Sequence, residues 1–311
     1  MRTIPPRRIA PMTSLGILVA LSFSLLSCVA KEKAPSAASA SAAGKTVLIV
    51  NGDDVGISAD FTDATLKAWD SGALDTLSVV SCGHDADRAI SLLKARPEIP
   101  VGLHFTLVGD WKPLSSGASL RGQDGNMWPT TREVVANVRA DEAAVEFDAQ
   151  LKKLADSGID VQCSDSHVSG YFSRQDIFAA VFERAKAQRI PLISAYYQGM
   201  PADWKPFMAV ADYGGIYVLP GGMEENPVNR AAAYWNMLDS FGPGVHYCFS
   251  HHGLGFADPA PAGDRLIRVD DSIFWTDPAT RSRIASMGIG RGSTAALRAG
   301  FRAALEDSRG R

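Results

Sequence analysis

The feature that most constrains the fold is an alternation, beginning near Thr46, between short apolar runs and amphipathic helical patterns. The runs have the length and β-branched composition of buried parallel strands. We expect strands at 46–51, 76–81, 100–107, 160–165, 190–194, 215–219 and 244–250. We expect helices near 60–71, 85–95, 132–157, 175–188, 228–241 and 278–287. This order predicts an α/β domain of right-handed βαβ units with a mostly parallel sheet, closed or nearly closed into a (β/α) barrel.

Residues suited to chemistry lie at the ends of four of these strands. They are Asp53 and Asp54 after the first strand, His104 within the third, His167 after the fourth, and His251 and His252 after the seventh. The C-terminal ends of parallel strands share one rim of a barrel, where α/β folds place their active sites. We therefore expect these side chains to meet.

One carboxylate and two imidazoles form a metal-ligand set that leaves positions open for water. A divalent ion lowers the pKa of bound water from about 15.7 toward roughly 7 in favourable zinc sites. The second carboxylate could then take a proton, and a histidine opposite could donate one to the leaving group. Because two adjacent like charges repel, we expect one of Asp53 and Asp54 to be held by a cation or to stay partly protonated. The set suits hydrolysis of an amide or an ester.

These residues also have structural interpretations. An aspartate of the 53–54 pair, or Ser58, could cap the helix that follows. A single histidine such as His104 is more often a hydrogen-bonded core residue than a ligand. The pair His251–His252 gains weight from Gly253, which allows close approach to a ligand at a strand end.

The N-terminus has the layout of an export signal. Residues 1–27 combine Arg2, Arg7 and Arg8 with an apolar stretch, and they end in a lipobox-like Leu-Leu-Ser before Cys28. We expect a bacterial lipoprotein signal peptide, with an ordinary secretory peptide as the alternative. Residues 28–45, rich in Ala and Ser, predict a flexible tether, and residues 46–311 predict one catalytic domain. The protein is then exported to the cell envelope and lipid-anchored at Cys28, facing the periplasm or the outer membrane.

Net charge and cysteine content bear on the kinds of partner and on disulfide bonding. Without residues 1–27 the chain has 28 basic residues (31 minus three arginines) and 34 acidic ones, a net charge of about −6. We therefore expect no nucleic-acid partner, since no basic stripe is present. Cys82, Cys163 and Cys248 are widely spaced within or beside apolar runs, so we expect small buried side chains, with one disulfide as the alternative.

Four short motifs in a fixed order resemble the YdjC/ChbG-like carbohydrate deacetylases. They are Asn51-Gly52-Asp53-Asp54-Val55-Gly56, Gly102-Leu103-His104, Asp165-Ser166-His167 and His251-His252-Gly253. Further similar segments, such as Asp124-Gly125 and Thr276-Asp277-Pro278, extend the resemblance over roughly residues 46 to 290.

The resemblance implies a distorted, TIM-like (β/α) barrel that removes acetyl groups from N-acetylated amino sugars. It implies one divalent metal ion, Zn²⁺ or Mg²⁺ with Mn²⁺ or Co²⁺ as alternatives, and it allows a homodimer. The implied metal ligands are Asp54, His104 and His167. Asp53 would be the catalytic base, His251 the general acid, and Asp165 would orient a ligand or the loop.

The chain departs from the family pattern at three points. Gly52 and Val55 replace the usual Ala and Phe, which should alter packing under the site. Val168 and its neighbours replace further histidines of chitooligosaccharide-type members, which puts that substrate in doubt. His252 replaces a proline, so either His251 or His252 could be the acid.

A long loop, 108–130, carries two tryptophans, Trp111 and Trp128. Either could stack on a sugar ring or could anchor the loop on the core. We place Trp111, with Asp165 and His252, among the residues expected to support the ligands or the substrate.

Two other functional classes stay open. A carbohydrate-binding envelope lipoprotein with a retained deacetylase fold would bind glycans without releasing acetate. A hydrolase of another ester, such as a phosphodiester, is disfavoured because Arg and Lys are scarce beside the ligand motifs.

Overall fold

The computed structural model describes residues 44–168, 170–193, 201, 203–204, 215–217, 230–254 and 262–309. They belong to one compact unit, Pro35–Arg311. Its strands are β1 (Thr46–Val55), β2 (Thr76–Val79), β3 (Val101–Phe105), β4 (Val161–Ser166), β5 (Gly215–Tyr217), β6 (Gly244–Ser250) and β7 (Ile289–Arg291). Its helices are α2 (Ala59–Asp70), α3 (Ala86–Lys94), α4 (Thr131–Asn137), α5 (Ala140–Asp156), α6 (Gln175–Gln188), α7 (Arg230–Asp239), α8 (Ala262–Thr276), α9 (Pro278–Ser286) and α10 (Thr294–Arg309), with 3₁₀ turns at η1 (Ala118–Leu120) and η2 (Gly170–Ser173).

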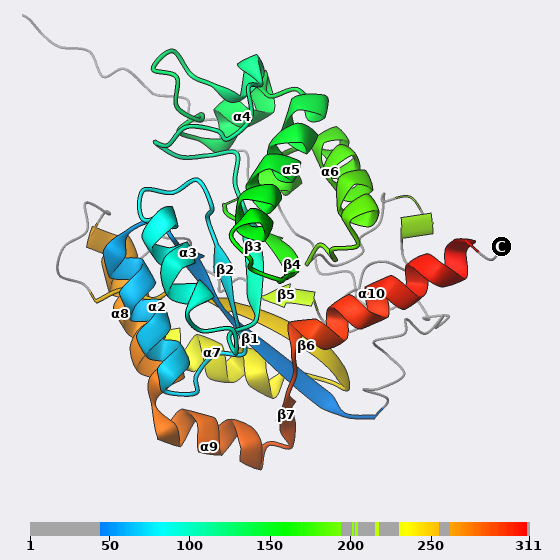
Figure 1. The fold of residues 1–311 in the computed structure, drawn as a ribbon. Helices are drawn as coiled ribbons and strands as arrows, with labels where there is room; N and C mark the ends of the chain where they lie inside the picture. Colours follow the sequence, from blue (N-terminus) through cyan, green and yellow to red (C-terminus); the bar gives the residue numbers. More distant parts are fainter. Residues whose placement is uncertain are drawn as a thin grey trace, which may run out of the picture. The chain divides into compact units, whose positions relative to one another are not determined.

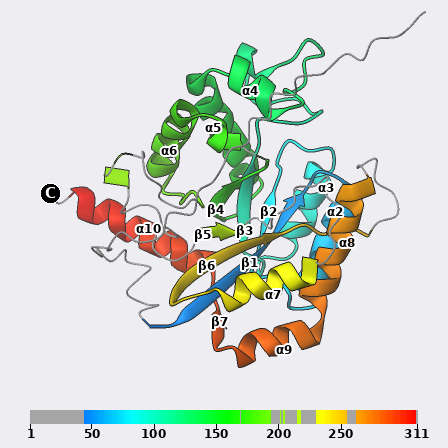
Figure 2. The same cartoon turned by 180° about the vertical axis from the view of Figure 1, so that it is seen from behind.

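The strands form one curled sheet in the order β4-β3-β2-β1-β6-β5, and all the strand pairs described are parallel. β7 pairs with the first residues of β1, and a single bridge from Ser164 to Leu192 continues the sheet beyond β4. The curl gives a half-barrel, as Figures 1 and 2 show. The predicted α/β class with a distorted barrel is confirmed.

Helices flank the curled sheet. α5 and α6 lie side by side near β3 and β4, and α2 and α8 lie side by side near the C-terminal end of β1 (Figures 1 and 2). β1 is the longest strand of the sheet, and its residues from Leu48 to Val55 are all buried. The central strand therefore carries the Asp53–Asp54 pair deep into the rim.

Most predicted elements are present within one to four residues, and α6 and β6 match their predicted bounds. The helix predicted over 132–157 is wrong as a single element, because Val138 and Arg139 adopt extended backbone between α4 and α5. The strand predicted at 190–194 is present only as the bridge at Leu192, with residue 194 outside the described part. α8, β7 and α10 were not predicted.

The N-terminal predictions fall outside the described residues, which begin at 44. This applies to the signal peptide, to Cys28 and to nearly all of the tether. Within the described residues, no helix is long and apolar enough to cross a membrane. Cys82, Cys163 and Cys248 are free and buried, as the apolar interpretation predicted.

Candidate functional site

The two neighbouring aspartates of β1 face the same site because the strand is irregular at its end. In a regular strand, adjacent side chains point to opposite faces. Asp54 instead has a left-handed backbone, with φ of 65°, and the β1–β2 register shifts between Gly52 and Val55. Asp is among the residues that tolerate this conformation, which non-glycine residues seldom adopt. Ser58 caps α2 by accepting from Phe61 N, so neither aspartate is needed as its cap.

Asp54 is the centre of the site. Its side chain is almost fully buried, and its Oδ1 lies 3.2 Å from His104 Nε2 and 3.0 Å from His167 Nδ1. Its Oδ2 accepts a hydrogen bond of 2.7 Å from Arg268 Nη2. Burial raises the pKa of Asp54, but Arg268 and His167 more than offset this, and the pKa falls well below its ordinary value. The surroundings of Asp54 thus favour its carboxylate form.

His104 is oriented by Asp165, its register partner on β4. Asp165 Oδ1 lies 2.7 Å from His104 Nδ1, which leaves Nε2 directed at Asp54. Asp165 Oδ2 accepts from Tyr247 OH and Asn51 Nδ2, both at 2.9 Å. Burial lowers the pKa of His104, but the charges of Asp165 and Asp53 raise it by more than this, so the pKa lies well above its ordinary value. A carboxylate behind a histidine is the arrangement that commonly orients metal-binding imidazoles.

Asp54, His104 and His167 fit a divalent cation. Each offers one ligand atom, and the three atoms lie within 4.8 Å of one another. Tetrahedral zinc with bonds of about 2.0–2.1 Å places its ligand atoms roughly 3.3 Å apart, close to the 3.2 and 3.0 Å between Asp54 Oδ1 and the two imidazoles. An oxygen and two nitrogens suit Zn²⁺, Mg²⁺, Mn²⁺ or Co²⁺. Asp53, His104 and Asp165 form a second such group, which shares His104.

Asp53 borders this group without the same close contacts. Its Oδ2 lies 3.8 Å from His104 Nε2 and 3.9 Å from His251 Nε2. Its Oδ1 accepts from Asn51 Nδ2 and, at 3.3 Å, from Ser78 Oγ. Burial raises the pKa of Asp53 well above its ordinary value, and His104 opposes the shift only in part. A carboxyl of raised pKa is a stronger base than an exposed one.

His251 and His252 have different surroundings although they are adjacent. His251 lines the site cavity, where its Nε2 faces Asp53 and Asp54. His252 is fully buried, and its two ring nitrogens lie 2.9 Å from Ser250 Oγ and 3.2 Å from Ser272 Oγ. Burial lowers the pKa of both imidazoles to about 3. His251 is therefore the histidine of this pair that can reach a substrate.

Two site residues of α8, Arg268 and Asp271, were not predicted from the sequence. Arg268 is 4% exposed, and its guanidinium carbon lies 3.6 Å from the centre of the Phe61 ring while Nη2 binds Asp54. A Cβ on Gly253 would lie only 3.1 Å from Arg268 Cβ, so the glycine makes room for the arginine.

Asp271, one turn further along α8, supports the other side of the site. Its Oδ2 accepts from His251 N at 3.0 Å, and its Oδ1 accepts from Tyr234 OH and from Arg230. α8 thus fixes the metal-site aspartate through Arg268 and the backbone of His251 through Asp271. No local pattern in the sequence marks either residue, because both contacts join segments far apart in the chain.

The cavity above these groups has a volume of about 430 Å³. Its lining combines the acidic and imidazole groups with four apolar side chains, Val168, Phe172, Ile193 and Phe249, which we call the apolar wall. Trp111 does not line it. Trp111 is 7% exposed and packs with Val80, Cys82 and Met127, and its ring centre is 6.0 Å from that of His167. This burial favours the loop-anchor interpretation over sugar stacking.

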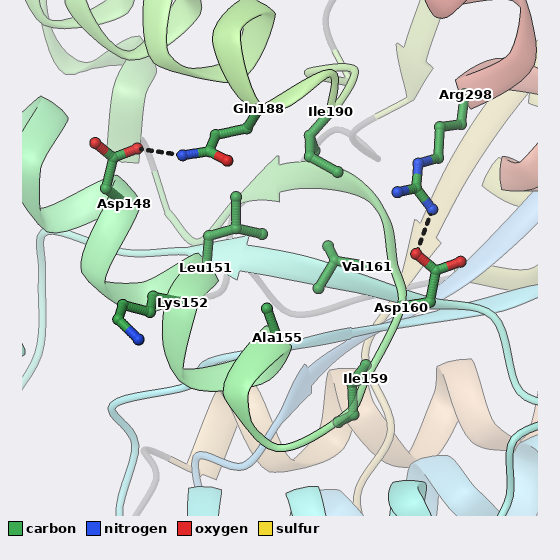
Figure 3. A pocket seen from close by; sticks show the side chains of 10 residues that line it. All are labelled: Asp148, Leu151, Lys152, Ala155, Ile159, Asp160, Val161, Gln188, Ile190 and Arg298. Atoms are coloured by element: carbon green, nitrogen blue, oxygen red, sulfur yellow. Dashed lines mark hydrogen bonds and ion pairs between the residues drawn. The ribbon is translucent and has the colours of Figure 1, made fainter.

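Another hollow, of about 390 Å³, lies between α5, α6, β4 and α10 (Figure 3). Each of its charged groups has a partner of opposite charge: Arg298 Nη1 lies 2.6 Å from Asp160 Oδ1, Lys152 pairs with Asp156, and Asp148 pairs with Arg184. None of the predicted site residues lines it. The rim cavity is therefore the better candidate for a reaction site.

Comparison with protein families gives one model, described as YdjC-like protein, which matches residues 47–286. A carbohydrate deacetylase of Geobacillus stearothermophilus is 29% identical over 144 residues, which are 46% of this chain and 58% of the relative. A chitooligosaccharide deacetylase of Serratia marcescens is 30% identical over 149 residues, which are 47% of this chain and 58% of the relative. The chain thus spans less than two thirds of the length of these curated relatives.

A solved structure from Enterococcus faecalis V583 shares the fold. It is described as a candidate cellobiose-phosphate cleavage protein, and it superposes with a TM-score of 0.67 at 18% identity. The match covers 81% of this chain and 99% of that one. At this identity the likeness supports the architecture of the curled barrel.

Proposed function

This chain belongs to the YdjC-like protein family, and from that membership we propose that it is a metal-dependent hydrolase that removes acetyl groups from N-acetylated amino sugars or oligosaccharides. The observation that carries the proposal is the meeting of Asp54, His104 and His167 at one rim, with Asp53 and His251 facing them. Relatives named as carbohydrate and chitooligosaccharide deacetylases support the substrate class.

We assign the metal to Asp54, His104 and His167. When bound there, a divalent ion would activate a water and polarise the carbonyl of the amide. Asp165 holds His104 with Nε2 toward Asp54, and Arg268 holds Oδ2 of Asp54 so that Oδ1 remains for the ion. These contacts fix the ligands before the substrate arrives, which limits the reorganisation that the reaction needs.

Asp53 and His251 are assigned the proton transfers. Water adds to the carbonyl carbon and gives a proton to Asp53; the C–N bond then breaks, and the amine leaves with a proton while the carboxylate is formed. Because burial lowers the pKa of His251 to about 3, His251 enters the reaction neutral. It must therefore acquire during turnover the proton that it delivers to the amine. Asp53, 3.9 Å away, is the nearest source.

The envelope location remains a proposal from the sequence. A lipid on Cys28, followed by the tether 28–45, would hold the catalytic unit at a membrane surface. Mass spectrometry of the mature protein tests it directly. A free N-terminus at Cys28 or beyond, without lipid, would contradict the anchor.

The test of the activity is acetate release by the full chain, after metal removal and re-addition, from a panel of N-acetylated sugars. We expect acetate only with metal, lost in Asp53→Asn and kept in the matched variant Asp160→Asn, whose carboxylate is remote from the site. Stoichiometric metal binding without acetate from any sugar would instead favour a glycan-binding lipoprotein.

A further inference from the structure

The apolar wall of the site cavity is unusual in being partly exposed. Val168 is 57% exposed and Phe172 is 39% exposed, and both line the cavity next to the metal-site residue His167. Ile193, fully buried, and Phe249 are the other two apolar side chains in the cavity lining. Exposed apolar side chains are stabilised when an apolar ligand group covers them. Apolar side chains together with a few polar groups in one cavity are typical of ligand sites.

Val168 has a backbone conformation that a β-branched residue seldom adopts. Its φ is 52°, in the left-handed region, where a β-branched residue is a true outlier. Position 170 requires glycine, since a Cβ there would lie 2.2 Å from Ser166 Oγ and 2.9 Å from Phe105 O. His167 N donates to Phe105 O at 2.9 Å and fixes the start of the turn. Backbone strain of this kind persists where the surroundings impose it, and it often marks a ligand site.

We propose that Val168 and Phe172 form an acyl-binding wall, so that the site accepts, beside N-acetyl groups, N-acylated amines with a longer acyl chain and binds the longer chain more tightly. The inference rests on the proposed amide hydrolysis and deepens it. The bonds that form and break are the same, and the acyl product is a longer carboxylate than acetate.

The chemistry of the wall decides which part of the substrate lies against it. An amide carbonyl at Asp54, His104 and His167 has two substituents, the acyl carbon chain and the amine with its sugar. Sugar hydroxyls gain no hydrogen bond from apolar side chains and lose those to water wherever the contact excludes water. An alkyl chain loses none, and it gains from each methylene that it buries. The cavity of about 430 Å³ also lies in the range of whole small-molecule sites, well beyond the need of one methyl group.

The experiment measures the affinity of the zinc-loaded full chain for acetohydroxamate, butyrohydroxamate and hexanohydroxamate by calorimetry. These probes carry the acyl chain without a sugar, so the result does not depend on the identity of the amine. Two fully buried methylenes correspond to about a fifteenfold gain in affinity. Because Val168 is half exposed, we expect butyrohydroxamate to bind about fivefold to fifteenfold more tightly than acetohydroxamate.

Variants at Val168 separate an acyl wall from ordinary packing. Val168→Gly and Val168→Asn both suit a left-handed backbone and remove the apolar side chain. We expect the butyryl-to-acetyl affinity ratio to fall below threefold in both, with a melting temperature unchanged or raised. In the control Val145→Ala, an exposed valine on α5, the ratio should stay at the wild-type value.

Three other results would contradict the proposal. A wild-type ratio below twofold, or a ratio that the Val168 variants leave intact, overturns the acyl wall. A melting temperature several degrees lower in both variants shows that Val168 serves folding instead. Absence of zinc-dependent binding of every hydroxamate overturns the proposed function as well, whereas chain-length-independent binding overturns the acyl wall alone.

Discussion

Replacing Arg268 by Met should destabilise the metal-free protein far more than the zinc-loaded protein. The substitution keeps an apolar stem over Phe61 and removes the guanidinium that lies 2.7 Å from Asp54 Oδ2. Asp54 is 1% exposed, so the variant leaves its carboxylate buried without its strongest partner. Removing one member of a buried ion pair typically costs about 3–5 kcal/mol.

The lower end of that range applies, because Asp54 Oδ1 keeps its contacts with His104 and His167. A loss of about 3 kcal/mol lowers the melting temperature of a domain of this size by about 6–12 °C. Zinc at the site would replace the missing positive charge. We therefore expect zinc to recover most of the loss in Arg268→Met.

The assay is thermal unfolding of wild type and variant with a chelator and with excess zinc. Arg291→Met is the matched control, because Arg291 Nε lies 2.8 Å from the mostly buried Asp75 and both lie outside the metal-site cluster. The decrease in melting temperature of Arg291→Met should be the same with and without zinc. Equal melting temperatures of wild type and Arg268→Met without metal would refute the reasoning, and so would a deficit that zinc leaves untouched.

Three further predictions concern residues that face the site or lie beneath it. Asp165→Asn should weaken zinc binding about 10–100-fold, by competition titration, because His104 loses its orienting carboxylate; an unchanged affinity would contradict this. His251→Asn should lower kcat about 10²–10⁴-fold, whereas His252→Asn should lower stability and leave the kcat of the folded protein near wild type; the reverse pattern would exchange their roles. Gly52→Ala should cost about 1–3 kcal/mol in urea unfolding, because its Cβ would lie 2.5 Å from a Thr65 methyl and 2.7 Å from a Leu74 methyl; an unchanged urea midpoint would show that α2 moves aside.

The residues at the rim were predictable because parallel pairing of the strands brings residues that are distant in the sequence close together in space. Asp53, His104 and His167 follow separate apolar runs, and parallel pairing brings those ends to one edge whatever the details of packing. The His104–Asp165 contact also follows from register, since the two residues are partners on neighbouring strands. No such rule distinguishes His251 from His252, because the direction of the chain after β6 decides which imidazole faces the cavity.

Arg268 was not predictable from any local pattern. It meets Asp54 across 214 residues of sequence, and an arginine within a helix resembles an ordinary solvent-facing residue. The scarcity of cations beside the ligand motifs counted against a phosphodiester substrate, and Arg268 weakens that argument because it adds a cation to the site. Its Nη2 is engaged with Asp54, however, which favours a structural use of the charge over anion binding.

The prediction that one of two adjacent carboxylates would be held by a cation is confirmed at Asp54, and the two carboxylates have different surroundings. Asp54 is paired with Arg268, and its pKa falls well below the ordinary value. Asp53 has no arginine, and burial drives its pKa upward. The left-handed backbone of Asp54 is what puts both groups on one side of β1, so the same distortion that creates the repulsion also creates the difference in basicity. A strand with regular alternation would have given one buried ligand and no neighbouring base. Because the two carboxylates differ in this way, one can hold a metal ion while the other moves a proton.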